Sequence, residues 1–278
     1  MDPVMFVDAS TNAARPTAHV KLHGPDAFAG MRKAGQLAAA CLDMLVPETK
    51  AGVTTERLDT LAREFILDHG ALPACVFYKG YRHTVCTSLN HVVCHGIPGS
   101  RVLRDGDTLN IDVTVIVDGW HGDTSRMYAI GETKKRDRRL MDVTYEAMMK
   151  GIETVRPGST LGDLGAAIQR HAESERMSVV RDFCGHGLGQ VFHDPPNILH
   201  YGRAGDGMKL RAGMIFTVEP MVNAGGNAVK VLNDGWTAVT KDKQTSTQYE
   251  HCVGVTETGY EIFTISPAGL HQPHQTPG

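Results

Sequence analysis

The sequence has few cysteines, and none of them are arranged to hold a structural metal or to crosslink the chain. Its six cysteines, at positions 41, 75, 86, 94, 184 and 252, form no CxxC pair and have no regular spacing. A structural zinc module is built from closely spaced Cys and His ligands, so the pattern argues against one. Thiols without a disulfide framework are typical of a protein in a reducing compartment.

Long apolar runs and an excess of charge of either sign are also missing. The first residues, MDPVMFVDASTNAARP, have neither the basic region nor the apolar core of a secretory signal. No segment approaches the length of a membrane span, so we expect a cytoplasmic protein without a membrane partner. The chain carries 28 basic and 31 acidic residues, which argues against nucleic acid as a partner and against an acidic disordered tail.

What remains is an ordinary globular composition. The 278 residues are 41% hydrophobic and 21% charged, and the chain is long enough to bury a large core. Residues 1–24 are polar with little periodicity, so we expect an N-terminal arm, and residues 267–278 resemble a solvated C-terminal tail. Between them we expect a single domain over residues 25–266.

The central region predicts alternating pairs of helices and groups of strands. Apolar residues recur at helical spacing over residues 26–45 and 54–68, and again over 138–155 and 159–175. Thr54 or Thr55 caps the second of these helices, and Ser159 or Thr160 caps the fourth. Strand patterns follow each helix pair, at residues 107–117 and 122–130, then at 213–223, 235–240 and 246–257.

The two groups of elements share a weak internal repeat. LRDGDTLNID (103–112) matches LRAGMIFTVE (210–219) at an offset of 107, and residues 52–58 match 158–164 at an offset of 106. Asp118-Gly119-Trp120 and Asp234-Gly235-Trp236 would be the turns of two equivalent hairpins. We therefore predict an α/β (α+β) fold in which a helix–helix–hairpin unit is duplicated, with halves at about 25–130 and 137–266. The alternative is that LRxG is simply a common way to enter a strand.

Five residues of metal-ligand type lie in stretches that are otherwise apolar, small or glycine-rich, where an unpaired charge is not expected. Asp112, Asp123, His186, Glu219 and Glu250 lie in LNIDVTV, GDTSRMY, CGHGLGQ, FTVEPMV and QYEHCVGV. Burying a carboxylate is costly unless a partner cancels its charge. The repeat would bring two acids from each half to one focus. Taken singly, Asp123 or Glu250 could instead be a surface acid.

This ligand set predicts a site for two divalent cations. Four carboxylates and one imidazole, without thiolate, suit Mn²⁺, Fe²⁺ or Co²⁺, and Zn²⁺ remains an alternative. Bridging carboxylates hold two ions roughly 3.5–4 Å apart and leave room for a bridging hydroxide, which suits hydrolysis. A phosphate-binding loop is the rival interpretation of CGHGLG, but no GK[ST] follows it and the GxGxxG spacing is absent.

Seven long motifs carry a family resemblance. They are NHVVCHGIP, LNIDVTV, GWHGDTSRM, CGHGLGQVFHDPP, FTVEPMVNAG, DGWTAVTKD and QYEHCVGVT. The chain resembles the type I methionine aminopeptidases in their bacterial form, from about Met31 to about Phe263. The resemblance implies the pita-bread fold, with two pseudo-symmetric halves around a curved antiparallel sheet. It also implies removal of the initiator methionine from nascent proteins whose second residue is small.

The resemblance assigns unequal roles to the five candidate ligands. Asp112 and Asp123 would hold one metal, His186 and Glu219 would complete the second, and Asp123 and Glu250 would bridge the two. A metal-bridged hydroxide would attack the scissile carbonyl. Glu219 would also carry a proton from the bridging water toward the leaving amine.

The resemblance also implies a set of residues that contact the substrate. His193 would hydrogen-bond the scissile carbonyl, and His95 would contact the scissile amide nitrogen or the residue after it. The methionine side chain would lie among sulfur and aromatic groups, which suit a thioether. These are Cys75, Tyr78, Tyr81, Cys86, Phe192 and Trp236. From the residues alone, each of these could equally be ordinary core or loop.

Further expectations follow from the same resemblance. A monovalent cation, Na⁺ or K⁺, would bind near Asn90, Val92 and Ser246. The partners would be nascent polypeptide N-termini, with transient ribosome contact, and the protein would be a monomer. Lys79 departs from the family, which commonly has His at that position of the pocket rim.

Two rival functions come from the same fold. One is a proline-type aminopeptidase or creatinase-like enzyme, which usually adds a large N-terminal domain. The other is a binding protein that has lost catalysis, whose signature would be missing ligands. All five ligands are present, and His193 and His95 are retained, so the sequence favours the aminopeptidase.

Overall fold

The computed structural model describes residues 6–9, 19–76 and 78–271. The four long helices agree with the sequence expectations, and two short 3₁₀ turns accompany them. The helical elements are α2 (Pro25–Leu45), η1 (Val46–Glu48), α3 (Thr55–Asp68), η2 (Tyr78–Gly80), α4 (Lys135–Ile152) and α5 (Leu161–Ser174).

The strands form several small antiparallel sheets, and only the pair β1–β2 is parallel among the described strands. They are β1 (Phe6–Asp8), β2 (Val20–Leu22), β3 (Leu72–Pro73), β4 (Val85–Leu89), β5 (Val92–Cys94), β6 (Thr108–Val117), β7 (Trp120–Ala129), β8 (Ser178–Val179), β9 (Gly185–Gly187), β10 (Asp194–Ile198), β11 (Ile215–Val218), β12 (Met221–Asn223), β13 (Val229–Val231), β14 (Ala238–Thr240), β15 (Ser246–Gln248), β16 (His251–Val255) and β17 (Tyr260–Ile262).

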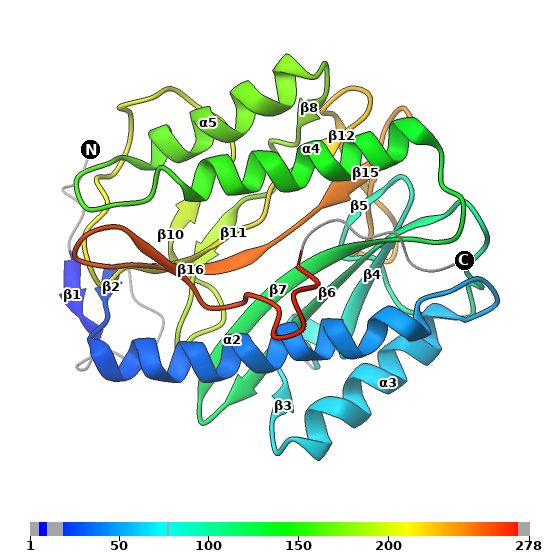
Figure 1. Cartoon of the computed structure of the whole chain (residues 1–278), viewed down its shortest axis with the longest axis horizontal. Helices are drawn as coiled ribbons and strands as arrows, with labels where there is room; N and C mark the ends of the chain where they lie inside the picture. Colours follow the sequence, from blue (N-terminus) through cyan, green and yellow to red (C-terminus); the bar gives the residue numbers. More distant parts are fainter. Residues whose placement is uncertain (1–5, 10–18, 77, 272–278) are drawn as a thin grey trace.

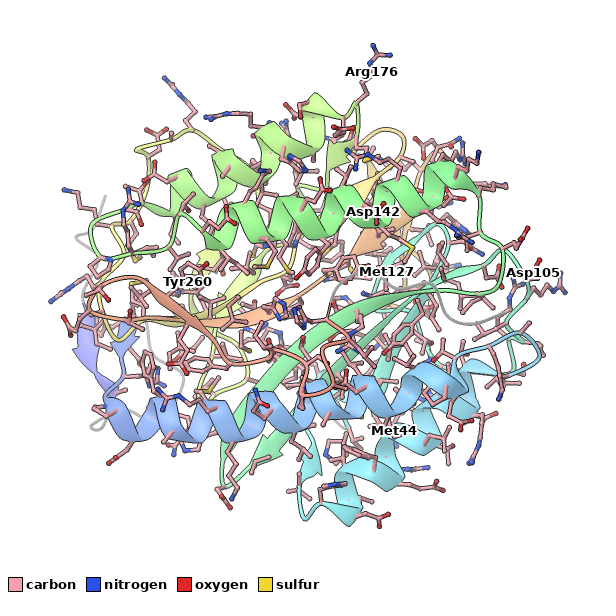
Figure 2. The ribbon with its side chains drawn as sticks, viewed as in Figure 1. Met44, Asp105, Met127, Asp142, Arg176 and Tyr260 are labelled. Atoms are coloured by element: carbon pink, nitrogen blue, oxygen red, sulfur yellow. The ribbon has the colours of Figure 1, made fainter. Side chains whose placement is uncertain are left out.

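Each half of the molecule packs its own pair of helices on its own strands. In Figure 1, α2 and α3 lie at the bottom of the view, α4 and α5 lie at the top, and the strands run between them. One apolar core joins α2 and α3 to β6. A second joins α4 and α5 to β11 and β16, and it includes Met127 of β7, which Figure 2 shows between the two helix layers. The burial of two separate apolar faces is the main driving force for this arrangement.

The backbone contacts that open each half are equivalent. The amide of Gly52 donates to Leu103 O at 2.9 Å, and the amide of Gly158 donates to Leu210 O at the same distance. Both glycines have a φ of 91°, a left-handed conformation that favours glycine. These residues stand at the offsets of 106 and 107 that the sequence repeat predicts, so the repeat corresponds to a repeated structure.

Helix capping follows the same correspondence. The Thr54 hydroxyl accepts a hydrogen bond from Arg57 N at the start of α3. Thr160 does the same for Asp163 N at the start of α5, in a full capping box. Of the alternatives that the sequence left open, Thr54 and Thr160 are therefore the caps.

The hairpins of the two halves are not equivalent, which differs from our expectation. Asp118-Gly119-Trp120 turns the hairpin of β6 and β7, as predicted. Asp234-Gly235-Trp236 instead lies between β13 and β14, a separate hairpin inserted between β12 and β15. The strands that carry the second half of the site are β11 and β16, which pair across this insertion. The sequence correctly indicated a turn at each Asp-Gly-Trp segment, but it did not show which strands pair with each other in the second half.

The last residues of the expected N-terminal arm are part of the folded molecule. Val20 is buried in the core of the second half, and His23 N donates to Gly213 O at 2.7 Å. At the other end, the Ser266 hydroxyl donates to both carboxylate oxygens of Asp43 on α2. Most of the expected arm and of the expected tail lies outside the described residues, so the domain boundaries remain predictions.

Two further expectations bear on environment. All six cysteines are free, as the absence of CxxC pairs suggested. Within residues 6–9, 19–76 and 78–271, no helix combines the length and the apolar composition that a membrane crossing requires.

Candidate active site

The first two candidate ligands come from one hairpin and share one face of it. In the register of β6 and β7, Asp112 pairs with Ser125 and Asp123 pairs with Thr114. Cross-strand partners, and residues two apart on one strand, point to the same side of a sheet. Asp112 and Asp123 are therefore diagonal neighbours on one face, although only Asp123 is fully buried.

The other three candidates come from the second half. His186 lies at the centre of β9, and Glu219 lies in the break between β11 and β12, where Pro220 ends the ladder as the sequence predicted. Glu250 stands between β15 and β16 and forms an isolated bridge with Ser125 of β7. This bridge joins the two halves, because Glu250 N donates to Ser125 O at 3.2 Å.

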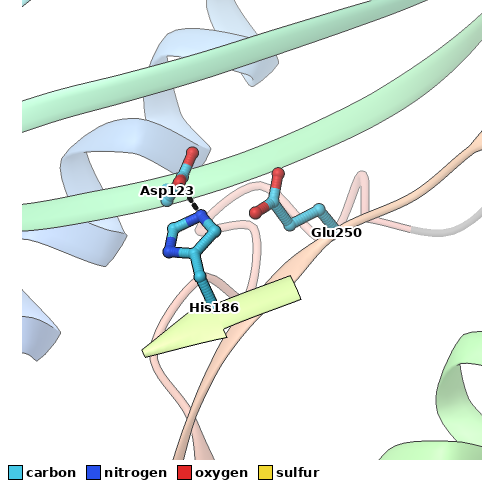
Figure 3. Close-up of side chains that lie close together, drawn as sticks. All are labelled: Asp123, His186 and Glu250. Carbon is cyan, nitrogen blue, oxygen red and sulfur yellow. Dashed lines mark ion pairs between the residues drawn. The ribbon is translucent and has the colours of Figure 1, made fainter. Parts of the chain in front are cut away.

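Three of the five side chains converge most closely. Asp123, His186 and Glu250 each offer one ligand atom, and these atoms all lie within 4.8 Å of one another. Figure 3 shows the three side chains pointing toward one another from β7, β9 and the break between β15 and β16. His186 Nε2 is 3.5 Å from Asp123 Oδ2 and 3.7 Å from Glu219 Oε1. Asp112 borders the same cavity but is not a member of the tight group.

The orientation of His186 suits a metal ligand. Its Nδ1 lies 3.1 Å from the carbonyl oxygen of Gly187, so a proton on Nδ1 is satisfied there. In the neutral ring, Nε2 would then be the unprotonated nitrogen, and it faces the carboxylates. A metal-binding histidine is generally oriented in this way, by a hydrogen bond from its other nitrogen.

Two threonines hold the carboxylates in place. The Thr114 hydroxyl donates to Asp123 Oδ1 at 2.7 Å, and the Thr217 hydroxyl donates to Glu219 Oε1 at 2.7 Å. Thr217 Oγ1 also accepts from His186 N at 3.0 Å, so it links two candidate ligands from different strands. Each acid is thus fixed by a neutral donor that leaves its charge uncancelled.

Burial makes the charges of the site unfavourable without a cation. Burial, and next the charge of Asp123, raise the pKa of both Asp112 and Glu250 well above the ordinary value. Burial raises the pKa of Glu219 to about 7, against the opposing effect of His186. For His186 burial alone would lower the pKa, but Asp123 and Glu219 outweigh it and raise the value.

This electrostatic arrangement fits divalent cations. Carboxylates that repel one another in a buried site are stabilised by a positive charge placed between them. The donors are oxygens and one imidazole nitrogen, which suit the harder divalent metals. The residues present therefore fit a divalent metal site.

The candidate ligands lie at one side of a cavity of about 500 Å³. The structure brings to it every residue that the sequence placed in the metal or substrate site. These are Cys75, Tyr78, Tyr81, Cys86, His95, Asp112, Asp123, His186, Phe192, His193, Glu219, Trp236 and Glu250. Their roles remain predictions, but their convergence on one cavity is a finding.

Aromatic contacts order the rest of the cavity wall. Tyr78 stacks on His193 with ring centroids 5.0 Å apart and an interplanar angle of 20°. The His193 ring in turn lies 4.1 Å from that of His186. On another part of the wall, Trp236 contacts Tyr81 at 5.0 Å and His95 at 6.2 Å. Loss of surrounding water lowers the pKa of both His193 and His95, so both rings are neutral at pH 7.

Comparison with known proteins places this site in a family. The sequence profile of metallopeptidase family M24 matches residues 29–257, which is most of the chain. This chain belongs to metallopeptidase family M24. Family membership bears out the use of divalent metal, for which the geometry above supplies the ligands.

Several M24 relatives are highly similar to the chain. A protein from Rickettsia prowazekii (strain Madrid E), named methionine aminopeptidase, is 56% identical over 256 residues, covering 91% of this chain and 98% of the relative. A methionine aminopeptidase from Escherichia coli (strain K12) is 46% identical over 248 residues, covering 88% of this chain and 94% of the relative. The predicted resemblance is confirmed at this level.

Solved structures confirm the predicted fold. The crystal structure of methionine aminopeptidase from Rickettsia prowazekii has a TM-score of 0.88, at 56% identity, and covers 88% of this chain and 99% of that one. The prolidase from Pyrococcus horikoshii OT3 has a TM-score of 0.69, but at 17% identity it shows the shared M24 fold alone. This chain spans 63% of that prolidase.

Sequence reasoning missed the residues that hold the candidate ligands in position. Thr114, Thr217 and Gln248 each stand two residues from a candidate ligand, and the Gln248 amide donates to Glu219 Oε2 at 3.3 Å. The period of two along a strand could have identified them. His200, whose Nε2 accepts from Glu219 N at 3.1 Å, had no such signal.

The residues predicted to bind a monovalent cation also lie together. Ser246 N donates to Asn90 O at 2.8 Å, and Val92 pairs with Val239 at the start of β5. Asn90 has a φ of 53°, a left-handed conformation that turns its carbonyl away from the usual direction of the strand. The Ser246 hydroxyl is buried and makes no hydrogen bond to the described part of the chain. This site stays a prediction.

Proposed function

We propose that this enzyme removes the N-terminal methionine from polypeptides whose second residue is small. One observation carries the proposal. A buried carboxylate and imidazole cluster lines the same cavity as a group of sulfur and aromatic side chains. The identity of 56% to a protein named methionine aminopeptidase supports the same reaction.

The proposed metal site takes two divalent ions, with Co²⁺, Mn²⁺, Fe²⁺ and Zn²⁺ as the candidates. Asp112 and Asp123 would hold the first ion, His186 and Glu219 would complete the second, and Asp123 and Glu250 would be shared. When bound, such ions make water a nucleophile at neutral pH and polarise the carbonyl that it attacks.

The side chains around the ligands supply proton transfer and orientation. Glu219 has a pKa of about 7 without metal, and the hydrogen bonds from Thr217 and Gln248 hold its two oxygens in place. It is therefore suited to accept a proton and pass it to the leaving amine. His193, neutral and stacked on Tyr78, would donate to the scissile carbonyl oxygen. His95 would contact the scissile nitrogen from beside Trp236.

The proposed methionine pocket is the sulfur and aromatic part of the cavity. Burial raises the pKa of Cys75 and Cys86, so both are neutral thiols there. Neutral sulfur and aromatic faces favour a thioether over a charged side chain. The remaining members of the pocket are Tyr78, Tyr81, Phe192 and Trp236.

Several finer properties belong to the same proposal. We expect Na⁺ or K⁺ near Asn90, Val92 and Ser246, nascent chains as substrates, transient ribosome contact, and a cytoplasmic monomer. Lys79 is exposed, and its ammonium lies 5.3 Å from the Tyr78 ring centroid, so it can alter the pocket rim without touching the ligands.

The proposal is tested with two tripeptides that differ only at the second residue. Metal-loaded protein is incubated with Met-Ala-Ser and Met-Lys-Ser, and free methionine is measured. We expect release from Met-Ala-Ser alone. Release from neither peptide after loading with each of the four metals would refute the function, and equal release from both would refute the small-residue rule.

A further inference from the structure

A buried ion pair lies beside the proposed substrate site, and the reaction described above makes no use of it. Lys21 Nζ of β2 is 2.9 Å from Asp194 Oδ2 of β10, and both side chains are 4% exposed. Taking two charges out of water is costly, and apolar residues of similar volume often serve stability as well or better. Stability alone is therefore a weak explanation of the pair.

The position of Asp194 suggests another explanation. It directly follows His193, and it lines the same cavity. Asp194 opens β10 by pairing with Gly187, but the register shifts before the next pair at Asn197. The hydrogen-bonded pairing of β9 and β10 therefore holds this end of the 189–194 loop weakly. The ion pair to Lys21 provides an additional anchor there.

The opposite end of the same loop is anchored too. The Gly189 carbonyl accepts from His121 N at 2.9 Å, and His121 Nδ1 lies 2.9 Å from the same oxygen. Phe192 and His193 thus stand between an anchor at Gly189 and an anchor at Asp194. Both rings reach the cavity from this short span.

We infer that the Lys21–Asp194 ion pair positions His193 for catalysis, so that the N-terminal strand β2 contributes to the active site. The inference rests on the proposed function, in which His193 contacts the scissile carbonyl. Lys21 is a positioning residue, because it acts through Asp194 and the loop.

The first measurement is steady-state kinetics on Met-Ala-Ser. Lys21→Met should lower kcat about tenfold or more per folded molecule while KM changes less than about threefold, because a misplacement of about 1 Å can cost as much as 100-fold in rate. Lys21→Arg keeps a cation and should stay within about threefold of wild type. Asp194→Asn keeps the shape of the side chain and removes its charge, so its kcat should be several-fold lower than that of wild type. This variant takes the place of Lys21→Met in the test if Lys21→Met does not fold.

A matched control separates position from stability. Asp43 and Arg126 form another ion pair with little exposure, at 2.8 Å and with 11% and 4% of the side chains exposed, and neither residue lines the cavity. Asp43→Asn should lower the free energy of unfolding but leave kcat within about twofold. A kcat for Lys21→Met within twofold of wild type would overturn the inference.

A double-mutant cycle tests the route of the effect. In a His193→Ala background, Lys21→Met should lower kcat by less than about a further twofold, because the effects of groups that act as a unit are not additive. A full multiplicative loss would overturn the inference, because Lys21 would then act by another route.

An activity-free readout keeps this inference distinct from the proposed function. His193 is stacked on Tyr78, so the aromatic ring current shifts its ring protons in an NMR spectrum of the metal-free protein. The signal, assigned by its loss in His193→Ala, should move in Lys21→Met and stay in place in Asp43→Asn. An unmoved signal would overturn the positioning role, whereas inactive wild-type protein would refute only the proposed function.

Discussion

The two halves of the molecule carry the site on different kinds of scaffold. In the first half, β6 and β7 pair without interruption over ten residues each, and Asp112 and Asp123 project from the middle of that hairpin. In the second half, the strand path breaks at Glu219 and again at Glu250, and the hairpin β13–β14 is inserted between them. His186 comes from a third strand of only three residues.

This difference in scaffold corresponds to two different roles in the proposed site, metal binding and proton transfer. A continuous hairpin holds its side chains rigidly, which suits residues that only bind a metal. Glu219 stands at a strand break, where its amide donates to His200 Nε2 instead of to a neighbouring strand. Its side chain lines the cavity and is partly exposed, and burial raises its pKa to about 7, so it is suited to exchange a proton with a substrate. In the proposed function, the first half would therefore form the metal-binding platform, and the second half would supply the proton carrier.

The largest expected effect comes from the platform. Asp123→Asn removes a charge from the tight group with His186 and Glu250, so we expect weakened binding of both metals. Activity should fall by more than about 1,000-fold, because bound ions supply several kcal/mol of transition-state stabilisation. Kinetics and calorimetric metal titration measure the two losses.

The same hairpin provides a control for this variant. Asp118 is exposed at its turn, five residues from Asp123, so Asp118→Asn should leave both activity and metal affinity unchanged. If Asp123→Asn kept wild-type metal affinity, the platform role of the first half would be wrong.

The next effect separates binding from proton transfer. Glu219→Gln keeps the shape of the side chain, and its amide oxygen can still accept from Thr217. We expect kcat to fall about 100-fold, the usual range for loss of a general acid or base. At least one metal should remain bound, as measured by metal analysis after gel filtration. A loss of both ions would make Glu219 part of the platform instead.

The contrast between the halves also explains what the sequence could reveal. The uninterrupted apolar alternation around Asp112 predicted its strand, and LRxG predicted the repeat, because both depend on neighbours in the chain. The pairing of β11 with β16 across an inserted hairpin depends on residues more than thirty positions apart, so the turn at Asp234 was misassigned. Lys21 was missed for the same reason, since Asp194 is its partner only in the folded molecule.

A smaller effect compares the two threonines that hold the acids. Thr114 contacts one candidate ligand, Asp123, whereas Thr217 contacts both Glu219 and His186. Loss of an outer hydrogen-bond partner typically costs 10–100-fold in metal affinity or activity, so we expect about tenfold for Thr114→Val and about 30-fold for Thr217→Val. Parallel metal titrations measure the ratio. Equal losses would show that the second half is held no more tightly by its threonine than the first.

The smallest effect tests the raised pKa of Glu219 directly, as a pH dependence of stability in metal-free protein. The folded pKa of about 7 exceeds the ordinary value of 4.5, so between these pH values the folded state binds more protons at Glu219 than the unfolded state does. Stability from this group is therefore present below about pH 4.5 and is lost as pH rises through 7, by at most about 1.4 kcal/mol per pH unit.

Buried histidines change stability with pH in the opposite direction to Glu219, so their contribution must be subtracted. Burial lowers the pKa of His200 and His251 to about 3, so they make the folded state more stable as pH rises from 3 toward 6.5. Both remain in Glu219→Gln, and the difference between variant and wild type isolates Glu219. In urea unfolding with chelator, the variant should gain stability over wild type progressively from pH 5 to pH 7, and added metal should remove that gain. Parallel stability curves would mean that the strand break leaves Glu219 as well solvated as a surface acid, and the proposed division between platform and proton carrier would then lose its electrostatic basis.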